Sequence, residues 1–321
     1  MRCRFGLPYK GSKNAIAPWI VENLPKADTF IDLFFGGGAV THAALLSGKY
    51  QHFIVNDIDG RLPKLFLDCI YGKYTIANHP EWISREEFLQ KKDGDAYIAL
   101  IWSFANNGID YIYGKEIEEF KHQYHIAVFE DKPELLRPYG YNISSSHLSN
   151  PYDRYLEFNK QIKKIARSDL DSIVRQIEIE RLQSLQSLQS LQSQQSLQSL
   201  QDDYNDAIGK VKTNLNDYII YCDPPYNQTN CGKYKGFDSD RFYKWALEQD
   251  NIFISEYQMP EGFIPYAWKE KTVLSAASTN ALKAKEIIYT NERTYSKFSD
   301  ERKQAIEYNF AEQMTIFDYM K

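Results

Sequence analysis

Residues 30–40 read FIDLFFGGGAV, and this stretch decides the fold. An apolar run passes through Asp32 into three consecutive glycines, and THAALLSG then has the composition of a helix, with Gly48 as its predicted C-cap. The next segment, HFIVNDID at 52–59, predicts a second short strand that ends in acidic residues. Strand, turn, helix and strand in this order predict an α/β fold with a parallel sheet and right-handed crossovers.

Two later apolar stretches predict further strands of the same sheet. DYIIYCDPPY at 217–226 is interpreted as the third strand and its exit, and NIFISEY at 251–257 as the fourth. The long stretch before them is rich in Tyr, Asn and His, with helices predicted around 84–92 and 153–180. We therefore predict a second, mainly helical domain inserted into an α/β sheet domain.

A low-complexity tract, RLQSLQSLQSLQSQQSLQSLQ, occupies residues 181–201. Leucine recurs at every third position, and Gln194 fills the one slot that lacks it. A period of three fits neither a helix stripe at 3.6 nor a strand at 2. We interpret the segment as a repeat tract of the gene that is tolerated because it lies at the surface.

The composition is that of a globular protein. The chain has 321 residues, of which 43% are hydrophobic and 25% charged, which excludes a disordered chain, a collagen-like fibre and a disulfide-stapled mini-protein. No run approaches the roughly 18 apolar residues of a membrane span, and the first residues lack the apolar region of a secretory signal. The four cysteines, Cys3, Cys69, Cys222 and Cys231, predict free thiols of a cytoplasmic protein without a zinc site.

The net charge of −5 does not favour nucleic acid as a partner, so any DNA contact must come from local clusters. Residues 269–303 contain eight Lys or Arg against five acids. We interpret this weak basic patch, taken alone, as a solvated helix face.

The glycine turn has the chemistry of a nucleotide site. Residues without side chains at a helix start let a ligand approach the backbone N–H groups. Asp57 ends the second strand, 21 residues after Gly36, where α/β nucleotide sites place a carboxylate on ribose hydroxyls. Thr41 stands where the dinucleotide pattern has its third glycine, which favours a nucleoside without phosphates. The alternative is a turn required only for tight packing.

The tetrapeptide Asp223-Pro224-Pro225-Tyr226 follows directly on the apolar run YIIYC. Two prolines at the end of a strand remove backbone donors and hold the chain extended. The Pro224 carbonyl is then predicted to point outward beside the Asp223 carboxylate. Two acceptors next to an aromatic ring suit a planar base that carries an amino group, and the alternative is a rigid turn with a satisfied aspartate.

A basic loop, Tyr9-Lys10-Gly11-Ser12-Lys13, precedes a helical sequence near the N-terminus. A loop of this kind at a helix start could hold an anionic group such as a carboxylate. A solvated loop is the alternative.

The order of these motifs resembles the Dam-type DNA adenine methyltransferases. YKGSK is followed by DLFFGGGAV, NDID, a long insert, DDY and YCDPPY. That family likewise has its cofactor half first, its target-recognition domain next and its catalytic motif after it. The resemblance is close over 1–70 and 200–260 and looser elsewhere, and its specific part is DPPY combined with FxGxG.

The resemblance implies roles for individual residues. Those that match the cofactor motifs are Tyr9, Lys13, Asp32, Phe34, Gly36, Gly38, Asp57, Asp203, Tyr204 and Asp223. Within this set, Asp57 matches the ribose-binding acid, and Asp203 with Tyr204 resembles the pair that flanks the cofactor adenine. The catalytic residues would be Asp223, Pro224, Pro225 and Tyr226.

The segment SFANNGIDYIYG at 103–114 resembles the start of the recognition domain. Asn106, Asn107 and Tyr111 are therefore candidates for DNA contact. A purely structural loop is the alternative.

The resemblance implies a Rossmann-like methyltransferase domain with an inserted, mainly helical target-recognition domain. We expect the cofactor-binding half at 1–72, the recognition insert at 73–180, the Leu-Gln-Ser tract at 181–201 and the catalytic half at 202–321. The implied reaction transfers a methyl group from S-adenosylmethionine to the amino nitrogen of an adenine flipped out of double-stranded DNA, without a metal. The implied setting is the cytoplasm of a bacterium, with a bacterial or phage gene, and a cognate restriction endonuclease is left open as a partner.

Three other functions are the alternatives to this one. The first is methylation of an RNA amino group with the same cofactor, and the second is an inactive DNA-binding regulator of the same fold. Asp223, Asp57 and the glycines are intact, which counts against an inactive protein. The third, a nicotinamide or flavin oxidoreductase, lacks the third glycine and leaves DPPY unexplained.

Overall fold

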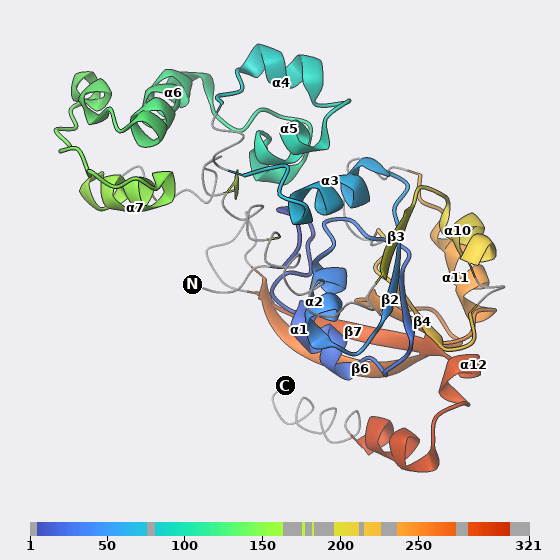
Figure 1. Cartoon of the computed structure of the whole chain (residues 1–321). Helices are drawn as coiled ribbons and strands as arrows, with labels where there is room; N and C mark the ends of the chain where they lie inside the picture. The colour runs from blue at the N-terminus through green and yellow to red at the C-terminus, as the bar shows by residue number, and fades with distance from the viewer. Residues whose placement is uncertain are drawn as a thin grey trace. The chain divides into compact units, whose positions relative to one another are not determined.

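The computed structural model describes residues 5–75, 81–162, 175–176, 182, 196–211, 215–225, 236–273 and 282–308 (Figure 1). The chain forms two compact units, which are described one at a time. The sheet unit consists of Pro18–Phe35, Ser47–Ile58 and Gln195–Lys321, and the helical unit consists of Met1–Ala17, Gly36–Leu46 and Asp59–Gln194. The domain boundaries expected from the sequence stay predictions.

A seven-stranded sheet lies at the centre of the described part of the sheet unit. Its strands are β1 (Thr29–Asp32), β2 (His52–Asn56), β3 (Ser196–Leu200), β4 (Tyr218–Cys222), β5 (Ile252–Glu256), β6 (Phe263–Val273) and β7 (Leu282–Asn291). They lie in the order β3-β2-β1-β4-β5-β7-β6, in which β7 is antiparallel to both neighbours and the other pairs are parallel. The predicted α/β fold with a mostly parallel sheet is confirmed.

The strand order reverses at β1. The chain runs from β1 outward to β2 and β3, and then returns to pair β4 on the other side of β1. The register places Asp32 between Val55 of β2 and Tyr221 of β4. Segments that follow β1, β2 and β4 therefore leave the sheet at the same edge. Open α/β sheets bind their ligands at this edge, beside the strand where the order reverses.

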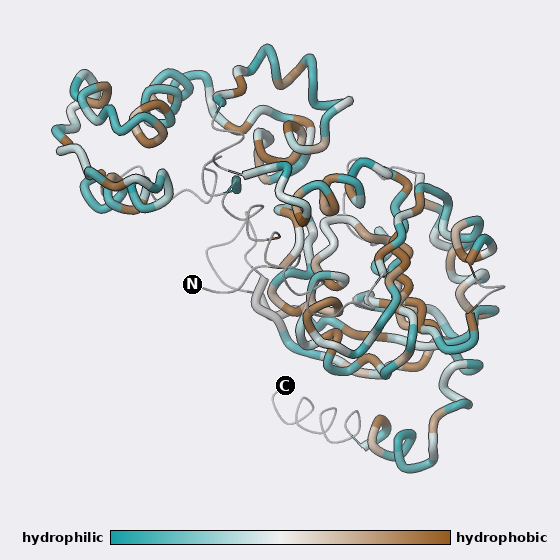
Figure 2. The backbone as a smooth tube through the Cα atoms, in the orientation of Figure 1, coloured by the Kyte–Doolittle hydropathy of each residue, from teal (hydrophilic) through white to brown (hydrophobic). Residues whose placement is uncertain are grey.

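Helices α10 (Tyr204–Val211) and α11 (Ser239–Leu247) cover one face of the sheet (Figure 1). Ile31, Ile220 and Ile254 from three adjacent strands pack against Ala207 and Ala246 of these helices in one buried cluster. The hydrophobic colour of the strands in Figure 2 marks the same layer. Burial of these aliphatic side chains is the main contribution to the free energy that packs α10 and α11 against the sheet.

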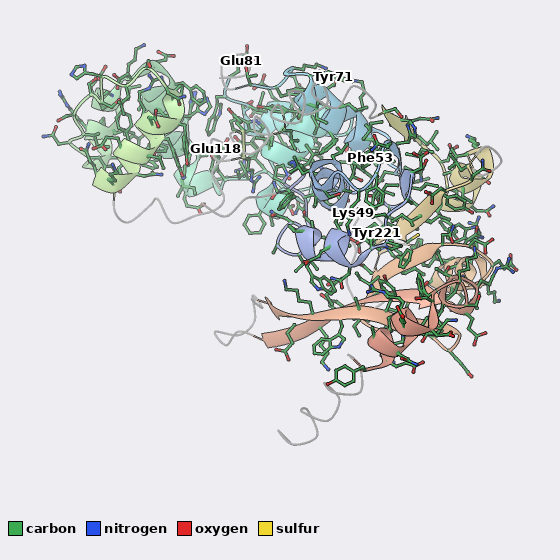
Figure 3. The ribbon with its side chains drawn as sticks, turned by 60° about the horizontal axis from the view of Figure 1, so that its bottom comes forward. Lys49, Phe53, Tyr71, Glu81, Glu118 and Tyr221 are labelled. Atoms are coloured by element: carbon green, nitrogen blue, oxygen red, sulfur yellow. The ribbon has the colours of Figure 1, made fainter. Side chains whose placement is uncertain are left out.

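Lys49, which Figure 3 labels, caps the C-terminal end of helix α1 (Ala17–Asn23) in the sheet unit. Its Nζ donates to the carbonyl oxygens of Val21, Glu22 and Leu24 at 2.6, 2.8 and 3.0 Å. The last carbonyls of a helix have no partner within the helix, and a lysine ammonium satisfies three of them here.

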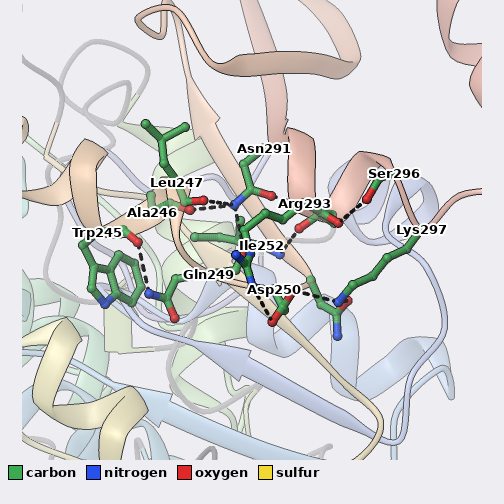
Figure 4. A network of polar contacts seen from close by, with 12 residues as sticks. Trp245, Ala246, Leu247, Gln249, Asp250, Ile252, Asn291, Arg293, Ser296 and Lys297 are labelled. Atoms are coloured by element: carbon green, nitrogen blue, oxygen red, sulfur yellow. Dashed lines mark hydrogen bonds and ion pairs between the residues drawn. The ribbon is translucent and has the colours of Figure 1, made fainter.

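Asn291, the last residue of β7, ties α11 to the sheet (Figure 4). Its Nδ2 donates to the carbonyl oxygens of Ala246, Leu247 and Gln249 at 2.8, 3.2 and 2.7 Å. Its Oδ1 accepts from Thr294 N and so caps α12 (Glu292–Tyr295). The C-terminal end of α11 is therefore fixed to β7.

The described part of the helical unit contains α-helices and short 3₁₀ helices. These are α2 (Ala39–Ser47), α3 (Arg61–Ile70), α4 (Arg85–Lys91), α5 (Ala96–Ile101), η1 (Phe104–Asn106), α6 (Lys115–Glu130), η2 (Pro133–Tyr139) and α7 (Pro151–Gln161). Phe120 and Tyr124 of α6 pack with Leu136 and Phe158 in a core of their own. The insert is mainly helical, as predicted, and Gly48 follows α2 with φ +66°.

The Leu-Gln-Ser tract contains a strand that its period of three did not predict, at an exposed edge of the sheet. Its described part, Ser196–Leu200, forms the edge strand β3 in parallel register with β2, and Leu182 at the other end is buried. On a strand, leucines three apart point to opposite faces. Leu200 packs on the cluster under α10 and α11, so Leu197 faces the other side. A period of three thus gives an edge strand one apolar residue for each face. Residues 183–195 of the tract lie outside the described residues.

The interpretation of the basic stretch at 269–303 as a helix face is wrong for its first part, whereas Arg293, Arg302 and Lys303 do lie in helical segments. Lys269 and Lys285 lie in the antiparallel strands β6 and β7, not on a helix. Lysines two apart are the pattern of one face of a strand. The Lys285 ammonium lies 4.8 Å from the centre of the Trp268 ring, so a cation–π contact replaces part of its hydration.

Candidate active site

Acidic residues collect at the carboxyl edge of the sheet. Asp32 ends β1, Asp57 follows β2 and Asp223 follows β4. Asp32 and Asp57 are buried, and Asp223 is half-buried. Burial raises the pKa of the Cys222 thiol well above its usual value, and the charges of Asp32 and Asp223 raise it further. The edge therefore carries a negative potential that favours a cationic ligand.

Cys222 is itself excluded as a nucleophile. It is fully buried and free, and the raised pKa keeps its thiol protonated. Cys69 is also free and buried. The prediction of free thiols is confirmed for these two, whereas Cys3 and Cys231 lie outside the described residues.

Asn56 holds three strand exits together, and the sequence analysis missed it. Its Nδ2 donates to Leu33 O at 3.2 Å and to Asp202 O at 3.0 Å, while its Oδ1 accepts from Asp202 N at 3.0 Å. Its backbone carbonyl accepts from Phe35 N at 2.9 Å. A buried asparagine as the last residue of an apolar strand was the available signal, because such a polar group must have partners.

Aromatic rings surround the exit of β1. Phe34 stacks on Tyr204 with ring centres 5.6 Å apart, and it makes edge contacts with Phe237 and Phe242 at 5.8 and 5.4 Å. Trp245 lies 4.8 Å from Tyr204. The motif residues Phe34 and Tyr204 are thus brought together, in an aromatic wall that the sequence analysis did not single out as a whole. Two of its further rings, Phe242 and Trp245, come from α11, and Phe237 lies just before that helix.

Asp203 caps α10 and forms an ion pair. Its Oδ1 accepts from Asn205 N at 3.1 Å, and Arg241 donates to both of its carboxylate oxygens at 3.0 and 3.3 Å. The Arg241 guanidinium also lies 5.4 Å from the centre of the Tyr204 ring. The Asp203–Tyr204 pair is therefore held by α11 as well as by its own helix.

The Tyr204 hydroxyl is buried and has no hydrogen-bond partner among the described residues. Burial raises the pKa of this phenol, so it stays neutral. We expect Tyr204→Phe to raise the free energy of unfolding by about 1 kcal/mol, because it removes an unsatisfied buried group. Tyr221→Phe is the matched control and should lower it by about 1 kcal/mol, since the buried Tyr221 hydroxyl bonds to Ser255 Oγ at 2.9 Å. Urea unfolding measures both, and a loss of stability in Tyr204→Phe contradicts this assignment.

The tetrapeptide begins at the end of β4. Leu33 N donates to Tyr221 O at 3.1 Å, which fixes β4 against the exit of β1. Pro224 is buried while Asp223 and Pro225 are half-buried. Tyr226 lies outside the described residues. The first three residues of the motif thus sit where the strand order reverses.

The glycine turn belongs to the helical unit. Gly36 and Gly38 have φ of +51° and +69°, a region that residues with a side chain rarely adopt. A Cβ on Gly36 would lie 3.3 Å from the Tyr9 ring, and one on Gly37 would lie 2.6 Å from Tyr9 Cβ. Tyr9 therefore packs directly on the turn. Lys13 is buried, and its carbonyl oxygen accepts from Ile16 N and Ala17 N at 2.9 and 2.8 Å.

His42 holds the N-terminal loop of the helical unit in place. Its Nδ1 accepts from Gly6 N at 2.9 Å, and Leu7 N donates to Gly37 O at 2.7 Å. Burial lowers the pKa of His42 to about 4. The imidazole is therefore neutral near pH 7, as an acceptor at Nδ1 requires.

This burial predicts a pH-dependent stability. Between the folded pKa of about 4 and the unfolded value near 6.5, the unfolded chain binds more protons. We expect the free energy of unfolding to fall by about 3 kcal/mol as the pH drops through that window. His42→Asn should remove this component, whereas His147→Asn, at an exposed histidine, should keep it. Urea midpoints from pH 4 to 7.5 measure the slope, and an unchanged slope in His42→Asn would contradict the prediction.

The loop at 103–111 is built by its own side chains. Asn107 Oδ1 accepts from Ile109 N and Asp110 N, and Asn106 Nδ2 donates to Leu100 O. Tyr111 is buried and its hydroxyl donates to Ile83 O at 2.7 Å. These interactions agree with the alternative that Asn106, Asn107 and Tyr111 stabilise the loop and do not contact DNA. The exposed apolar side chains of the loop are instead Phe104 and Ile109, at 49% and 45%.

Two further findings concern metals and membranes. The described residues contain no group of three or more His, Cys, Asp or Glu that could hold a metal ion. Within the same residues, every helix is too short or too polar to cross a bilayer.

The fold is that of an α/β protein with a mostly parallel sheet, in which an Asp-Pro-Pro segment follows the strand next to β1. The sequence matches the family model of D12 class N6 adenine-specific DNA methyltransferases over residues 9–256. The match spans well over half of the chain, and the chain belongs to this family. It is accordingly a DNA methyltransferase that acts on adenine.

Other comparisons add little. None of the curated proteins matches the sequence. Two solved structures of the rRNA methyltransferase aviRa from Streptomyces viridochromogenes each cover 84% of this chain and 80% of their own, with 11% identity and TM-scores of 0.34 and 0.32. Values this low carry no argument about substrate.

Proposed function

We propose that this chain transfers a methyl group from S-adenosylmethionine to N6 of an adenine flipped out of duplex DNA, with Asp223 and Pro224 as the acceptors that orient the amino group. The observation that supports this most is the position of Asp223-Pro224-Pro225 at the end of β4, beside the strand where the sheet order reverses. A base inside a duplex cannot reach a site enclosed in a protein, so it must leave the stack.

The residues at the sheet edge fit S-adenosylmethionine. Asp32 and Asp223 provide negative potential for a sulfonium, and Asp57 follows β2, where a carboxylate can accept from ribose hydroxyls. Phe34 and Tyr204 supply an aromatic wall for an adenine. From the motif match, we assign Tyr9, Lys13, Asp32, Phe34, Gly36, Gly38, Asp57, Asp203, Tyr204 and Asp223 to the cofactor.

The chemistry assigned to the chain is orientation and charge stabilisation. When bound, S-adenosylmethionine supplies a methyl group whose bond to sulfur breaks as a bond to N6 forms. The Asp223 carboxylate and the Pro224 carbonyl accept hydrogen bonds from the two N–H groups of the adenine amino group. These two bonds draw the nitrogen lone pair out of conjugation with the ring. Asp223 stabilises the positive charge that develops on nitrogen and takes the proton it loses. Tyr226 is assigned, from the motif alone, to stack on the flipped base.

We infer that the loop at 103–111 contacts DNA through Phe104 and Ile109. Apolar side chains read thymine methyl groups or wedge between base steps. Ala105, Asn106 and Gly108 have positive φ, and Ser103 Oγ accepts from Gly108 N, so the loop is a tight, internally bonded turn. A rigid support limits the entropy lost on binding.

The double variant Phe104→Ser, Ile109→Ser should weaken DNA binding about tenfold and leave cofactor binding unchanged, because it removes two exposed apolar contacts. Leu89→Ser, at an apolar residue of α4 that is 54% exposed, is the matched control. Fluorescence anisotropy with a duplex that contains the methylated motif measures the effect. Equal affinities for the double variant and the wild type would exclude the loop.

Single-molecule sequencing tests the function as a whole. DNA from cells that express the wild type should carry N6-methyladenine in one short motif, and DNA from cells that express Asp223→Ala should not. Modified bases in neither sample, together with labelled methyl groups in RNA, would replace the proposal with the RNA-directed alternative. Calorimetry with S-adenosylmethionine then separates an RNA enzyme from a protein that binds no cofactor.

A further inference from the structure

The acceptor positions of the Asp203 carboxylate are almost fully used. Each carboxylate oxygen offers two acceptor positions, so the group has about four. Oδ1 accepts from Asn205 N at 3.1 Å and from Arg241 Nη2 at 3.0 Å. Oδ2 accepts from Arg241 Nη1 at 3.3 Å. One acceptor position on Oδ2 is left by these bonds, which is the number that a single N–H of an amino group needs.

Arg241 has a fixed base from which to hold this carboxylate. It lies in the first turn of α11, where its backbone N donates to the Oδ1 of the helix cap Asp238 at 2.9 Å. Its neighbour Phe242 is fully buried against Phe34 and Tyr204. The far end of α11 is tied to β7 by Asn291 (Figure 4). The arginine therefore projects from a helix that is anchored at both ends.

The Arg241 guanidinium combines two contacts that a lysine cannot reproduce together. It spans both carboxylate oxygens of Asp203 and lies over the Tyr204 ring at 5.4 Å. A planar guanidinium fixes the plane of a carboxylate, whereas an ammonium acts as a point charge. Both side chains are partly exposed, at 55% and 32%, so the pair contributes little to folding, and its effect on orientation is the more important one.

We propose that Arg241 is a positioning residue for cofactor recognition: it fixes the Asp203 carboxylate so that one oxygen is presented to the 6-amino group of the cofactor adenine. This inference rests on the proposed function, and in particular on the assignment of Asp203 and Tyr204 to the adenine. It adds a residue outside every motif that the sequence analysis singled out. Arg241 touches Asp203 and not the reacting atoms, so it acts on cofactor affinity and not on the chemical step.

The test is calorimetry with two probes, S-adenosylhomocysteine and S-inosylhomocysteine, in which an oxo group replaces the 6-amino group. The wild type should prefer the adenosyl compound. Arg241→Gln should bind S-adenosylhomocysteine about fivefold more weakly and S-inosylhomocysteine as the wild type does. The affinity of Arg241→Lys for S-adenosylhomocysteine should fall between those of the wild type and Arg241→Gln. Lys244→Gln removes a positive charge from the same helix at an exposed position and should match the wild type.

Asp203→Asn completes the design. Because Arg241 acts through this carboxylate, the double variant Asp203→Asn, Arg241→Gln should bind S-adenosylhomocysteine no more weakly than Asp203→Asn alone. Additive losses, an unchanged preference in Arg241→Gln, or an equal loss in Lys244→Gln would each overturn the proposal for Arg241. If the wild type binds neither probe, the proposed function fails with it. If it binds both equally, only the Asp203 and Arg241 assignments fail.

Discussion

Asp223→Ala is expected to lower the rate of methyl transfer to DNA by roughly 10³-fold, while the folded protein keeps its cofactor site. The carboxylate is assigned to orient the amino group and to stabilise the charge that develops on nitrogen, and alanine does neither. The affinity for S-adenosylmethionine should fall by only about fivefold, since one of several nearby carboxylates is lost. S-adenosylhomocysteine carries no sulfonium charge, so its affinity should not change. Single-turnover kinetics and calorimetry measure the two effects separately.

Asp240→Ala is the matched control for this variant. Asp240 is exposed in the first turn of α11, so its loss changes the net charge equally but leaves the sheet edge intact. We expect wild-type kinetics for it. If Asp223→Ala retained more than a tenth of the wild-type rate, Asp223 could not be the acceptor of the mechanism.

Asn56→Ala should lower the free energy of unfolding by about 3 to 4 kcal/mol, which corresponds to a fall in Tm of roughly 5 °C for a chain of 321 residues. The substitution leaves the buried Leu33 O and both backbone groups of the half-buried Asp202 without their side-chain partner. Because these bonds join the exits of β1, β2 and β3, the affinity for S-adenosylmethionine should fall as well. Differential scanning calorimetry and ligand titration measure the two results.

Asn216→Ala provides the comparison at an exposed asparagine that precedes β4 at the opposite edge of the sheet. Its Tm should stay within about 1 °C of the wild type. A Tm of Asn56→Ala within that same range would show that the exits of the strands are held by other contacts.

Local patterns predicted the central strands correctly because each carries its whole signal within a few residues. β1, β2, β4 and β5 are apolar runs that end in a glycine, an aspartate or a turn, and buried parallel strands need little else. The glycine turn was equally readable, since positive φ at Gly36 and Gly38 accounts for the residue type. These elements also carry most of the motif residues, which is why the edge of the sheet was predicted together with the fold.

The remaining features depend on partners far away in the sequence. β3 was missed because its leucines serve two faces, a demand set by the sheet and not by the tract. Arg241 is an ordinary charged residue of an amphipathic helix until the fold brings Asp203 within 3.0 Å. In the loop at 103–111 the sequence indicated Asn106 and Asn107 as DNA contacts, but their side chains bond within the loop. Residue types alone do not tell which polar groups are already hydrogen-bonded in the fold.

The edge strand made from the repeat has a consequence for the gene. Each Leu-Gln-Ser unit is encoded by nine nucleotides, so gain or loss of whole units keeps the reading frame. A change upstream of Ser196 leaves the pentapeptide Ser196–Leu200 intact, still joined to Asp202 and its bonds to Asn56. The gene can therefore gain or lose Leu-Gln-Ser units while the enzyme keeps the edge strand β3.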